Sequence, residues 1–356
     1  MSPNLDRLIS VLRHECRPGP VPFMELFADQ PIMEAVLGRP MVPPGLADNE
    51  ARRANWDNLM AFYGQLGYDY VPVGVGAGFQ RATADTVDTA TLSHGTRHWD
   101  NSTTGLIESW ADFEAYPWPK PEAVDYSWPE YALRHMPEGM GAMAMGAGGI
   151  LEWVMWLMSY ERFAVALYDQ PDLIEAMFSR VTEILVTICR NLLDMGGFCG
   201  FFIGDDMGHY SGTMISPAAM RKYVFPNQRK LADVAHAHGV PFLLHACGNL
   251  SLVMEDLIED VRIDAKHSFE DKIEPVESLH ARYGRRIALL GGVDVDLLVR
   301  GSEAQVRART RQLLDALGGS GSWCLGTGNS VANYIPVSNY LAMLDEGRRW
   351  NREHYA

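Results

Sequence analysis

A histidine and a cysteine, His245 and Cys247, lie two residues apart directly after the apolar run Phe242–Leu244. On an extended backbone, residues i and i+2 project from the same face, so the imidazole and the thiol are expected to point to one place. Both groups are common zinc ligands, and a site with three protein ligands leaves one position open for chemistry. Cys324, at the end of a later apolar run, is a candidate third ligand. The alternative is a cysteine that packs as a small apolar side chain beside a hydrogen-bonded histidine.

Carboxyl groups near two other apolar runs are candidate catalytic residues. Asp205 and Asp206 follow the run at residues 200–204. Neighbouring side chains at a strand end point in different directions, so we expect the two to hold separate partners, a ligand or the N–H of a metal-bound histidine. The alternative is an acidic turn that leads into the next helix. Glu25 lies inside the run at residues 21–27, where a buried carboxyl needs a partner or a raised pKa. It is a candidate proton donor, or else one half of a salt bridge.

The elements that must position these residues follow a repeated pattern. Eight short apolar runs have the length of strands, and segments with helical periodicity lie between most of them. The runs are at residues 21–27, 68–74, 141–145, 200–204, 241–245, 263–269, 286–291 and 322–325. Eight alternating strand–helix units predict an α/β protein with a single (β/α)8 TIM barrel. The rival is a doubly wound open sheet, which usually carries an early glycine fingerprint that this sequence lacks.

The length of the chain exceeds what such a barrel needs, which is about 250 residues. We therefore predict one domain over residues 1–356, with an N-terminal extension at residues 1–19 and an inserted loop region at about residues 77–138. Active sites of these barrels lie at the carboxyl ends of the strands. Strand ends are polar in any soluble protein, but residues near those ends are also the candidates for substrate binding. These candidates are Glu152, Trp156, His209, His267, Glu270 and Asn329.

Composition excludes some classes of partner. The formal net charge is -15 and no run is rich in lysine or arginine, which argues against binding to nucleic acid or to an anionic membrane. Five scattered cysteines, an odd number, do not resemble a disulfide framework and favour a reduced compartment. With no signal-peptide pattern and no apolar run of about 18 residues, we expect a cytoplasmic protein, either a monomer or a homodimer.

The order of motifs along the chain resembles the uroporphyrinogen decarboxylase superfamily, and most closely its branch of zinc- and corrinoid-linked methyltransferases. The motifs are Gly-Asp-Asp-x-Gly, His-x-Cys-Gly, Gly-Gly-Val-Asp, and Gly-x-Gly-Asn-Ser-Val followed by Ile335-Pro-x-x-Asn339. The resemblance covers roughly residues 20–345 and also implies a (β/α)8 barrel. It implies zinc bound by His245, Cys247 and a later residue that falls at Asn329. The third ligand therefore stays open among Cys324, Asn329, Glu270 and His267.

The chain departs from the decarboxylases of this superfamily in the residues that the resemblance would assign to substrate binding. Those enzymes carry an arginine-rich motif after the first strand, whereas residues 22–29 here contain no arginine. They carry an aspartate at the end of the second strand, which residues 70–75 lack. Their tyrosine after the third strand falls near Trp156, and their late histidine falls at Asn329. A pocket without these groups does not suit a tetrapyrrole with eight carboxylates.

The resemblance and the departures together predict a zinc-dependent methyltransferase. It would move a methyl group between a small methylated substrate and a corrinoid protein, a thiol or a folate. No corrinoid-binding Asp-x-His-x-x-Gly segment is present, so any corrinoid is expected on a separate protein. One alternative is a metal-independent decarboxylase (a carboxy-lyase) for a smaller substrate, with Glu25, Asp205 or His267 as acid or base. Another is a non-catalytic barrel that binds a corrinoid protein.

Overall fold

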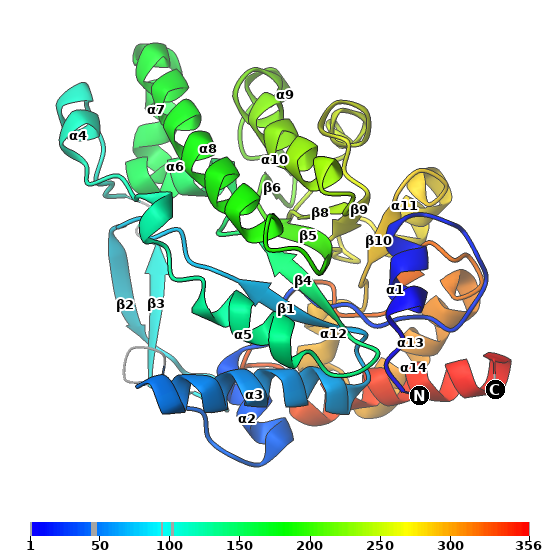
Figure 1. The fold of residues 1–356 in the computed structure, drawn as a ribbon. Helices are drawn as coiled ribbons and strands as arrows, with labels where there is room; N and C mark the ends of the chain where they lie inside the picture. Colours follow the sequence, from blue (N-terminus) through cyan, green and yellow to red (C-terminus); the bar gives the residue numbers. More distant parts are fainter. Residues whose placement is uncertain (1, 44–47, 94, 101–102, 356) are drawn as a thin grey trace.

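A curled, seven-stranded parallel sheet forms the centre of the computed structural model, which describes residues 2–43, 48–93, 95–100 and 103–355 (Figure 1). Its strands follow one another in chain order: β1 (Tyr70–Gly74), β4 (Gly141–Met145), β5 (Phe198–Gly204), β8 (Phe242–His245), β9 (Ala265–His267), β10 (Ala288–Leu290) and β11 (Trp323–Cys324). Because all seven run parallel, their carboxyl ends meet at one edge. This is an α/β fold with seven of the eight predicted strands.

The predicted first strand, at residues 21–27, is not formed, and this part of the barrel prediction is wrong. The segment makes only isolated parallel bridges, from Phe23 to Leu325 and from Ala28 to Val331. Towards β1 the link is a side chain, because the Tyr70 hydroxyl accepts from the Glu25 N–H and donates to the Glu25 carbonyl. Pro20 and Pro22 have no N–H group to donate to a neighbouring strand, which explains the lost pairing. Eight strands therefore do not close a ring in the described residues.

Helices cover the outside of the sheet. The main ones are α3 (Asn49–Leu66), α6 (Ile150–Met158), α7 (Tyr160–Asp169), α8 (Pro171–Leu193), α10 (Phe225–Ala237), α11 (Val276–Tyr283), α12 (Val295–Arg300), α13 (Glu303–Leu317) and α14 (Val337–Tyr355). Further elements are α1 (Leu5–Leu12), α2 (Gln30–Leu37), α9 (Pro217–Ala219) and the π-helical turns Met220–Val224 and Asp256–Val261. In the described residues, no helix combines the length and the apolar character that crossing a membrane requires.

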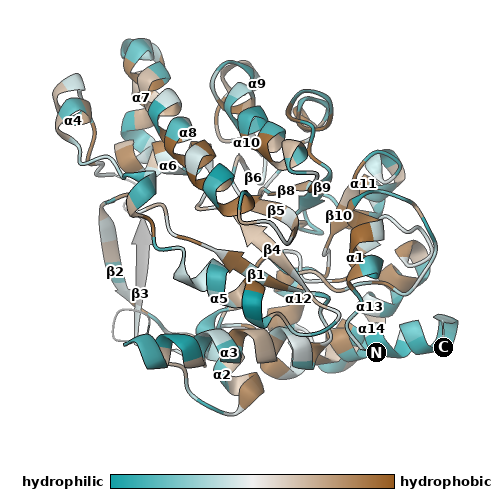
Figure 2. Ribbon diagram, viewed as in Figure 1, coloured by the Kyte–Doolittle hydropathy of each residue, from teal (hydrophilic) through white to brown (hydrophobic). Residues whose placement is uncertain are grey.

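The core lies between the sheet and these helices. All residues of β8 are buried, as expected for a strand covered on both faces. Figure 2 shows β1 and β4 as hydrophobic, whereas α8 alternates between hydrophobic and hydrophilic residues along its length. This alternation matches an amphipathic helix that buries one side, with Leu173, Met177 and Phe178 among its buried residues.

The segment between β1 and β4 contains a separate antiparallel ribbon, β2 (Thr83–Val87) and β3 (Thr96–Asp100), which stands apart from the main sheet in Figure 1. It continues into α4 (Trp110–Ala115), the 3-10 turn Pro121–Ala123 and α5 (Ser127–His135). A second small ribbon, β6 (Gly208–His209) and β7 (Gly212–Thr213), follows β5. The single domain over residues 1–356, with its extension and insertion, stays a prediction.

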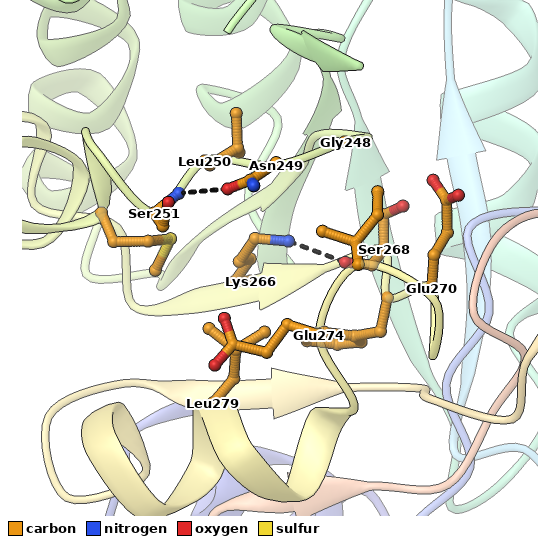
Figure 3. Close-up of a pocket in the computed structure, with 12 residues that line it drawn as sticks. Gly248, Asn249, Leu250, Ser251, Lys266, Ser268, Glu270, Glu274 and Leu279 are labelled. Atoms are coloured by element: carbon orange, nitrogen blue, oxygen red, sulfur yellow. Dashed lines mark hydrogen bonds between the residues drawn. The ribbon is translucent and has the colours of Figure 1, made fainter. Parts of the chain in front are cut away.

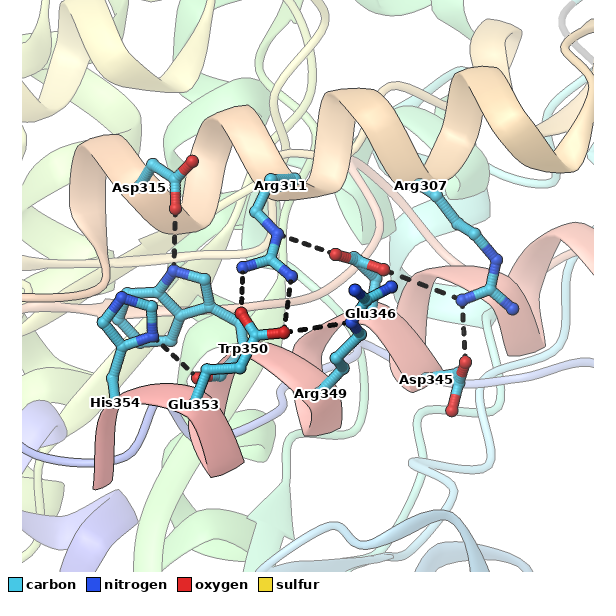
Figure 4. Close-up of polar contacts among 9 residues, drawn as sticks. All are labelled: Arg307, Arg311, Asp315, Asp345, Glu346, Arg349, Trp350, Glu353 and His354. Carbon is cyan, nitrogen blue, oxygen red and sulfur yellow. Dashed lines mark hydrogen bonds and ion pairs between the residues drawn. The ribbon is translucent and has the colours of Figure 1, made fainter. Parts of the chain in front are cut away.

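Ion pairs join α13 to α14, the last two long helices (Figure 4). The Glu346 carboxylate on α14 is almost fully buried and accepts a hydrogen bond from Arg311 Nε at 2.7 Å. Arg307 contacts Glu346 and also donates to Asp345 at 2.7 Å. The Trp350 indole N–H donates to Asp315 at 2.8 Å. These contacts hold α14 against α13, the helix that precedes β11. They thereby stabilise the edge of the sheet at β11, which lies beside the segment at residues 21–27.

A buried ion pair closes the amino end of the sheet. Asp69, directly before β1, is fully buried and accepts from the Asn4 N–H and from Arg7 Nε, both at 2.8 Å. Burial raises the pKa of Asp69 although Arg7 and Asn4 act against it. The buried Asp69 carboxylate therefore needs the positive charge of Arg7, and the ion pair attaches α1 to the sheet.

Arg7→Met is expected to lower the free energy of unfolding by about 3 kcal/mol, because it leaves a buried carboxylate without its cation. Urea unfolding monitored by tryptophan fluorescence measures this loss. The double variant Arg7→Met/Asp69→Asn should recover part of it. The control Arg17→Met removes an arginine whose pair with Glu15 is largely exposed and should cost less than about 0.5 kcal/mol. Equal losses in Arg7→Met and Arg17→Met would contradict this role of Asp69.

Candidate metal centre at the carboxyl ends of the strands

Three different ligand atoms converge where β5 and β8 end. Asp206, His245 and Cys247 each offer one atom, and these atoms lie within 4.8 Å of one another. Gly204 of β5 is paired with His245 of β8, so Asp206 and Cys247, each two residues further on, come side by side. The Cys247 N–H donates to Asp206 Oδ1 at 2.9 Å. His245 Nε2 lies 3.4 Å from Asp206 Oδ1 and 3.4 Å from Cys247 Sγ.

The Cys247 sulfur also accepts hydrogen bonds from two other strand ends. Asn329 Nδ2, in the loop after β11, lies 3.2 Å from Sγ, and Ser268 Oγ, directly after β9, lies 3.5 Å away. Burial and the neighbouring charge of Asp206 raise the pKa of Cys247 to about 12, against the lowering effect of these two donors. The thiol therefore keeps its proton at neutral pH unless a cation displaces it.

Asp206 has the opposite electrostatic character. Burial disfavours its charged form, but hydrogen bonds from His245 and Cys247 outweigh this and lower the pKa of Asp206 to about 2. The carboxylate is consequently ionised at every physiological pH. It places a fixed negative charge beside the imidazole and the thiol, which is the charge that a divalent cation requires.

A second histidine sets the orientation of His245. His267 Nδ1 lies 2.7 Å from His245 Nδ1, so one of the two nitrogens must donate. Burial lowers the pKa of His267 far below its usual range, and this ring is neutral. His267 Nε2 has no hydrogen bond of good geometry in the described residues, but the nearby Thr327 carbonyl favours a proton on it. From this network we assign a proton to His245 Nδ1, so that Nε2, the nitrogen that faces Asp206 and Cys247, is the one that would bind a cation.

The donor set fits a cation such as zinc. Zinc accepts sulfur, nitrogen and oxygen ligands in tetrahedral sites, and three protein ligands leave one position open. Magnesium and calcium prefer oxygen ligands throughout, so a thiol and an imidazole argue against them. Asp206, His245 and Cys247 would therefore hold the cation, with Asn329, Ser268 and His267 around them.

Cys324, the candidate third ligand from the sequence, lies outside this cluster, and Asp206 offers the third donor instead. Cys324 pairs in register with Leu290 of β10, which pairs with His267 of β9. In a curled sheet of tilted strands, such a row of paired residues shifts along the barrel axis from strand to strand. The charges that act on the buried Cys324 thiol are those of Asp69 and Arg7, at the amino end of the sheet.

Asp205 caps a helix. Its carboxylate accepts from the Glu152 N–H at 3.0 Å and the Leu151 N–H at 3.3 Å, in the first turn of α6, and from Gln228 Nε2 at 2.7 Å. Burial raises the pKa of Asp205 to about 6 in spite of these donors. Asp205 thus places α6, while Asp206 faces the cluster, and the two carboxylates have separate partners.

The side of α6 that follows this cap carries two of the predicted pocket residues, Glu152 and Trp156. Burial, followed by the charges of Asp205 and Asp206, raises the pKa of Glu152 well above its usual range. Trp156, one turn further on, lies under the guanidinium of Arg81 at 4.6 Å from the ring centre. Glu152 therefore lies close to Asp206, and an aromatic side chain follows it on α6.

Two other predicted pocket residues lie at the surface. His209, in β6, is exposed and its Nδ1 accepts from the Ser211 N–H at 3.3 Å. Glu270 is exposed after β9, and partial burial followed by the charge of Asp294 raises its pKa. Neither belongs to the cluster of three ligand atoms, and their role in substrate binding stays a prediction.

Glu25 lies in an aromatic pocket away from the cluster. Its carboxyl accepts from the Thr327 N–H at 3.1 Å, from the Thr327 hydroxyl and from the Tyr68 hydroxyl at 3.4 Å. Burial raises the pKa of Glu25 to about 8, against the lowering effect of these donors. In the described residues, no hydrogen-bond partner of Glu25 belongs to the cluster. It anchors Thr327, two residues before Asn329.

Sequence reasoning missed two contributors to this centre, Ser268 and Lys266, and it gave Asp206 a different role. The signal for Asp206 was available, because it follows Gly204 by the same two residues that separate Cys247 from His245. Ser268 adopts a left-handed backbone conformation, with φ at 84°, which sequence spacing does not reveal.

The chain resembles known proteins in sequence and in fold. Residues 107–350 match the model of a family described as uroporphyrinogen decarboxylase (URO-D). Two curated proteins called uroporphyrinogen decarboxylase, from Streptomyces coelicolor and Streptomyces avermitilis, are 26% and 24% identical over 176 residues, which are 49% of this chain and 46% of each relative. The chain spans about half the length of the curated relatives it matches.

A solved structure described as a methyltransferase from Methanosarcina mazei is similar along almost the whole chain. The TM-score is 0.70, with 16% sequence identity, and the match covers 98% of this chain and 99% of that one. At this level of identity the likeness shows a shared fold.

Glu25→Gln is expected to flatten the pH dependence of stability. The folded-state pKa of Glu25 is about 8, against 4.5 for an ordinary glutamate. The stability that its proton contributes is complete below pH 4.5 and is lost as pH rises through about 8, by about 1.4 kcal/mol per pH unit. The free energy of unfolding in urea, compared between variant and wild type across this range, should therefore shift in favour of the variant.

The exposed residue Glu122 provides the matched control for this measurement. Glu122→Gln should follow the wild type at each pH. A constant difference between Glu25→Gln and the wild type across the range would show that Glu25 is ionised in the folded protein.

Proposed function

Because the chain belongs to the uroporphyrinogen decarboxylase family, we propose that it is a methyltransferase whose centre is formed by Asp206, His245 and Cys247. The observation that carries this proposal is the convergence of a carboxylate, an imidazole and a thiol at the carboxyl ends of two neighbouring strands. Three ligands of this kind leave one position of a zinc-like cation open for a reacting group. The similarity in fold to a methyltransferase is consistent with it.

The electrostatics of the centre argue against a polycarboxylate substrate. Residues 22–29, which include the bridging residues Phe23 and Ala28, contain no arginine or lysine. This segment therefore offers no cation to a substrate with several carboxylates, and the ionised Asp206 adds a negative charge when no metal is bound. A neutral methylated molecule meets no such cost. We therefore propose a small O- or N-methylated substrate, with a thiol, a folate or a corrinoid on a separate protein as the other partner.

Residues of the chain divide the work of such a transfer. A bound zinc ion would supply Lewis acidity, which favours a thiolate acceptor or stabilises a leaving heteroatom. Asp206 orients the Cys247 backbone through its N–H, and Asn329 and Ser268 hold the sulfur by hydrogen bonds. The Glu152 carboxyl close to Asp206, whose pKa burial raises, would donate a hydrogen bond or a proton to the substrate heteroatom.

An aromatic cleft lies at the same edge of the sheet, where β1 ends. Its volume is about 540 Å³, and it is lined by Val75, Met33 and the stacked rings of Trp56 and Trp128, whose centres are 5.3 Å apart. Such walls suit a flat apolar group. We propose that the cleft accepts the apolar part of the substrate, and that the chain acts in the cytoplasm as a monomer or a homodimer.

A second candidate is a metal-independent decarboxylation of a smaller acid. The names of the two curated relatives favour it, as does the raised pKa of Glu152, which suits a general acid. Such an activity would be insensitive to chelators. A barrel that only binds a corrinoid protein would show binding without turnover.

The purified protein is expected to bind about one zinc ion per chain, measured by elemental analysis and by competition with a chromogenic chelator. Cys247→Ser and Asp206→Asn should each weaken binding by about 100-fold or more, because outer partners alone are worth 10–100-fold and these are the ligands themselves. Cys324→Ala is the matched control and should bind as the wild type does, because Cys324 lies outside the cluster of three ligand atoms.

Two results would contradict the proposed centre. Loss of zinc in Cys324→Ala but not in Asp206→Asn would show that the third ligand is misassigned. A protein without stoichiometric zinc whose activity resists chelators would favour the decarboxylase.

A further inference from the structure

Lys266 is a buried lysine on the outer side of β9, between the sheet and the helices, and only 3% of it is exposed. Its ammonium donates to three backbone carbonyls, of Ser268 at 2.7 Å, His267 at 3.3 Å and Ala246 at 3.4 Å. An ammonium has three N–H groups, so all of its donors are used. Figure 3 shows the Lys266 side chain reaching the Ser268 turn from within a pocket.

The three carbonyls belong to the turns that carry the metal centre. Ala246 stands between His245 and Cys247, and Ser268 follows His267. Ser268 has a φ of 84°, which costs a residue with a side chain on the order of 1–2 kcal/mol. A charged hydrogen bond to the Ser268 carbonyl offsets this strain, because such bonds are stronger than neutral ones. Lys266 therefore stabilises a turn that the backbone alone would not favour.

Both hydrogen-bond donors to the Cys247 sulfur depend on this turn. Ser268 itself supplies one through Oγ. The next N–H, of Phe269, donates to the Gly328 carbonyl at 2.9 Å and so fixes the loop from which Asn329 supplies the other. If the turn relaxes, both donors move away from the sulfur.

We propose that Lys266 is a positioning residue: its ammonium holds the Ser268 turn so that Ser268 and Asn329 donate to the Cys247 sulfur, and it thereby sets the sulfur's reactivity and its affinity for a metal. The effect on metal affinity rests on the proposed function. The effect on the reactivity of the sulfur is independent of it, because the hydrogen bonds to Cys247 form within the protein and need no metal.

The surroundings of Lys266 favour a fixed cation over a nucleophile. Burial lowers the pKa of Lys266 to about 8, against the raising effect of Cys247, Asp206 and nearby glutamates, so the charged form prevails at neutral pH. The small pocket beside it is lined by Glu270 and Glu274, and the ammonium lies 4.7 Å from the centre of the Phe269 ring. A nucleophilic amine needs a free lone pair, whereas here each N–H is engaged with a carbonyl.

Lys266→Met tests the proposal, since methionine keeps the apolar stem and removes the charge and the three donors. With Co²⁺ alone as the probe, the variant is expected to bind about 10–100-fold more weakly, the usual cost of losing an outer partner. Its thiolate-to-cobalt charge-transfer band should move to lower energy, because the sulfur loses two hydrogen bonds. Lys272→Met is the matched control, with the same loss of charge on an exposed side chain in the same loop, and should leave both readouts unchanged.

Ser268→Gly keeps the proposal testable if Lys266→Met does not fold. Glycine adopts a φ of 84° without strain, so this variant should be at least as stable as the wild type, yet it lacks the Oγ donor. Its band should move in the same direction by a smaller amount. In the double variant Lys266→Met/Ser268→Gly, the band should shift by less than the sum of the shifts in the two single variants, because Lys266 acts through Ser268. Wild-type spectra and affinity in a folded Lys266→Met, or full additivity, would overturn the proposal.

A metal-free measurement separates this proposal from the metal centre. In a Cys16→Ser background, which removes the exposed cysteine, iodoacetamide at a fixed pH should alkylate Cys247 several-fold faster in Lys266→Met, because the two donors no longer cover the sulfur. If the wild type bound no Co²⁺, the proposed metal centre would fail while this rate still tested Lys266. An unchanged rate would overturn the positioning role even if the metal binds.

Discussion

The parallel pairing of β5, β8 and β9 is the constraint on which the centre depends. It places Gly204, His245 and His267 in one hydrogen-bonded row. Residues paired in this way project to the same side, so the two imidazoles meet directly, and Asp206 and Cys247 meet two residues further on. Backbone pairing and helix capping therefore set the positions of the ligand atoms. Such regular elements position a site more precisely than a free loop does.

Outside this row, two buried polar side chains hold the turns that reach over the sulfur. Glu25 secures the Thr327 backbone from one side of the barrel, and Lys266 secures Ser268 from another. Burial acts on them in opposite directions: the pKa of the carboxyl is raised to about 8 and that of the amine is lowered to about 8. The partners of Lys266 are main-chain carbonyls and those of Glu25 include the Thr327 N–H, and such groups need a hydrogen bond in the interior in any case.

Much of this arrangement is readable from the sequence, and what is not readable has identifiable causes. Apolar runs of strand length gave seven strands, and the i, i+2 spacing gave the convergence of His245 and Cys247. Cys324 also lies at a strand end, but it does not reach the cluster. The stagger between tilted strands decides this, and sequence spacing does not reveal that stagger. Asn329, five positions later, is the residue of that unit that reaches the sulfur. The partners of Asp205 and Lys266 depend on a helix cap and on a positive φ, neither of which has a periodic signal.

The charges in the cluster also limit what can react there. Asp206 is a fixed anion, and Cys247 becomes a second one only when a cation replaces its proton. A divalent cation with these two ligands and a neutral histidine has no net charge, and a neutral centre in a buried site avoids the desolvation cost of an unpaired ion. Such a centre attracts neither anions nor cations from a distance. Under the proposed function, selection among substrates would then fall to the apolar and aromatic walls of the cleft and to a hydrogen bond with Glu152.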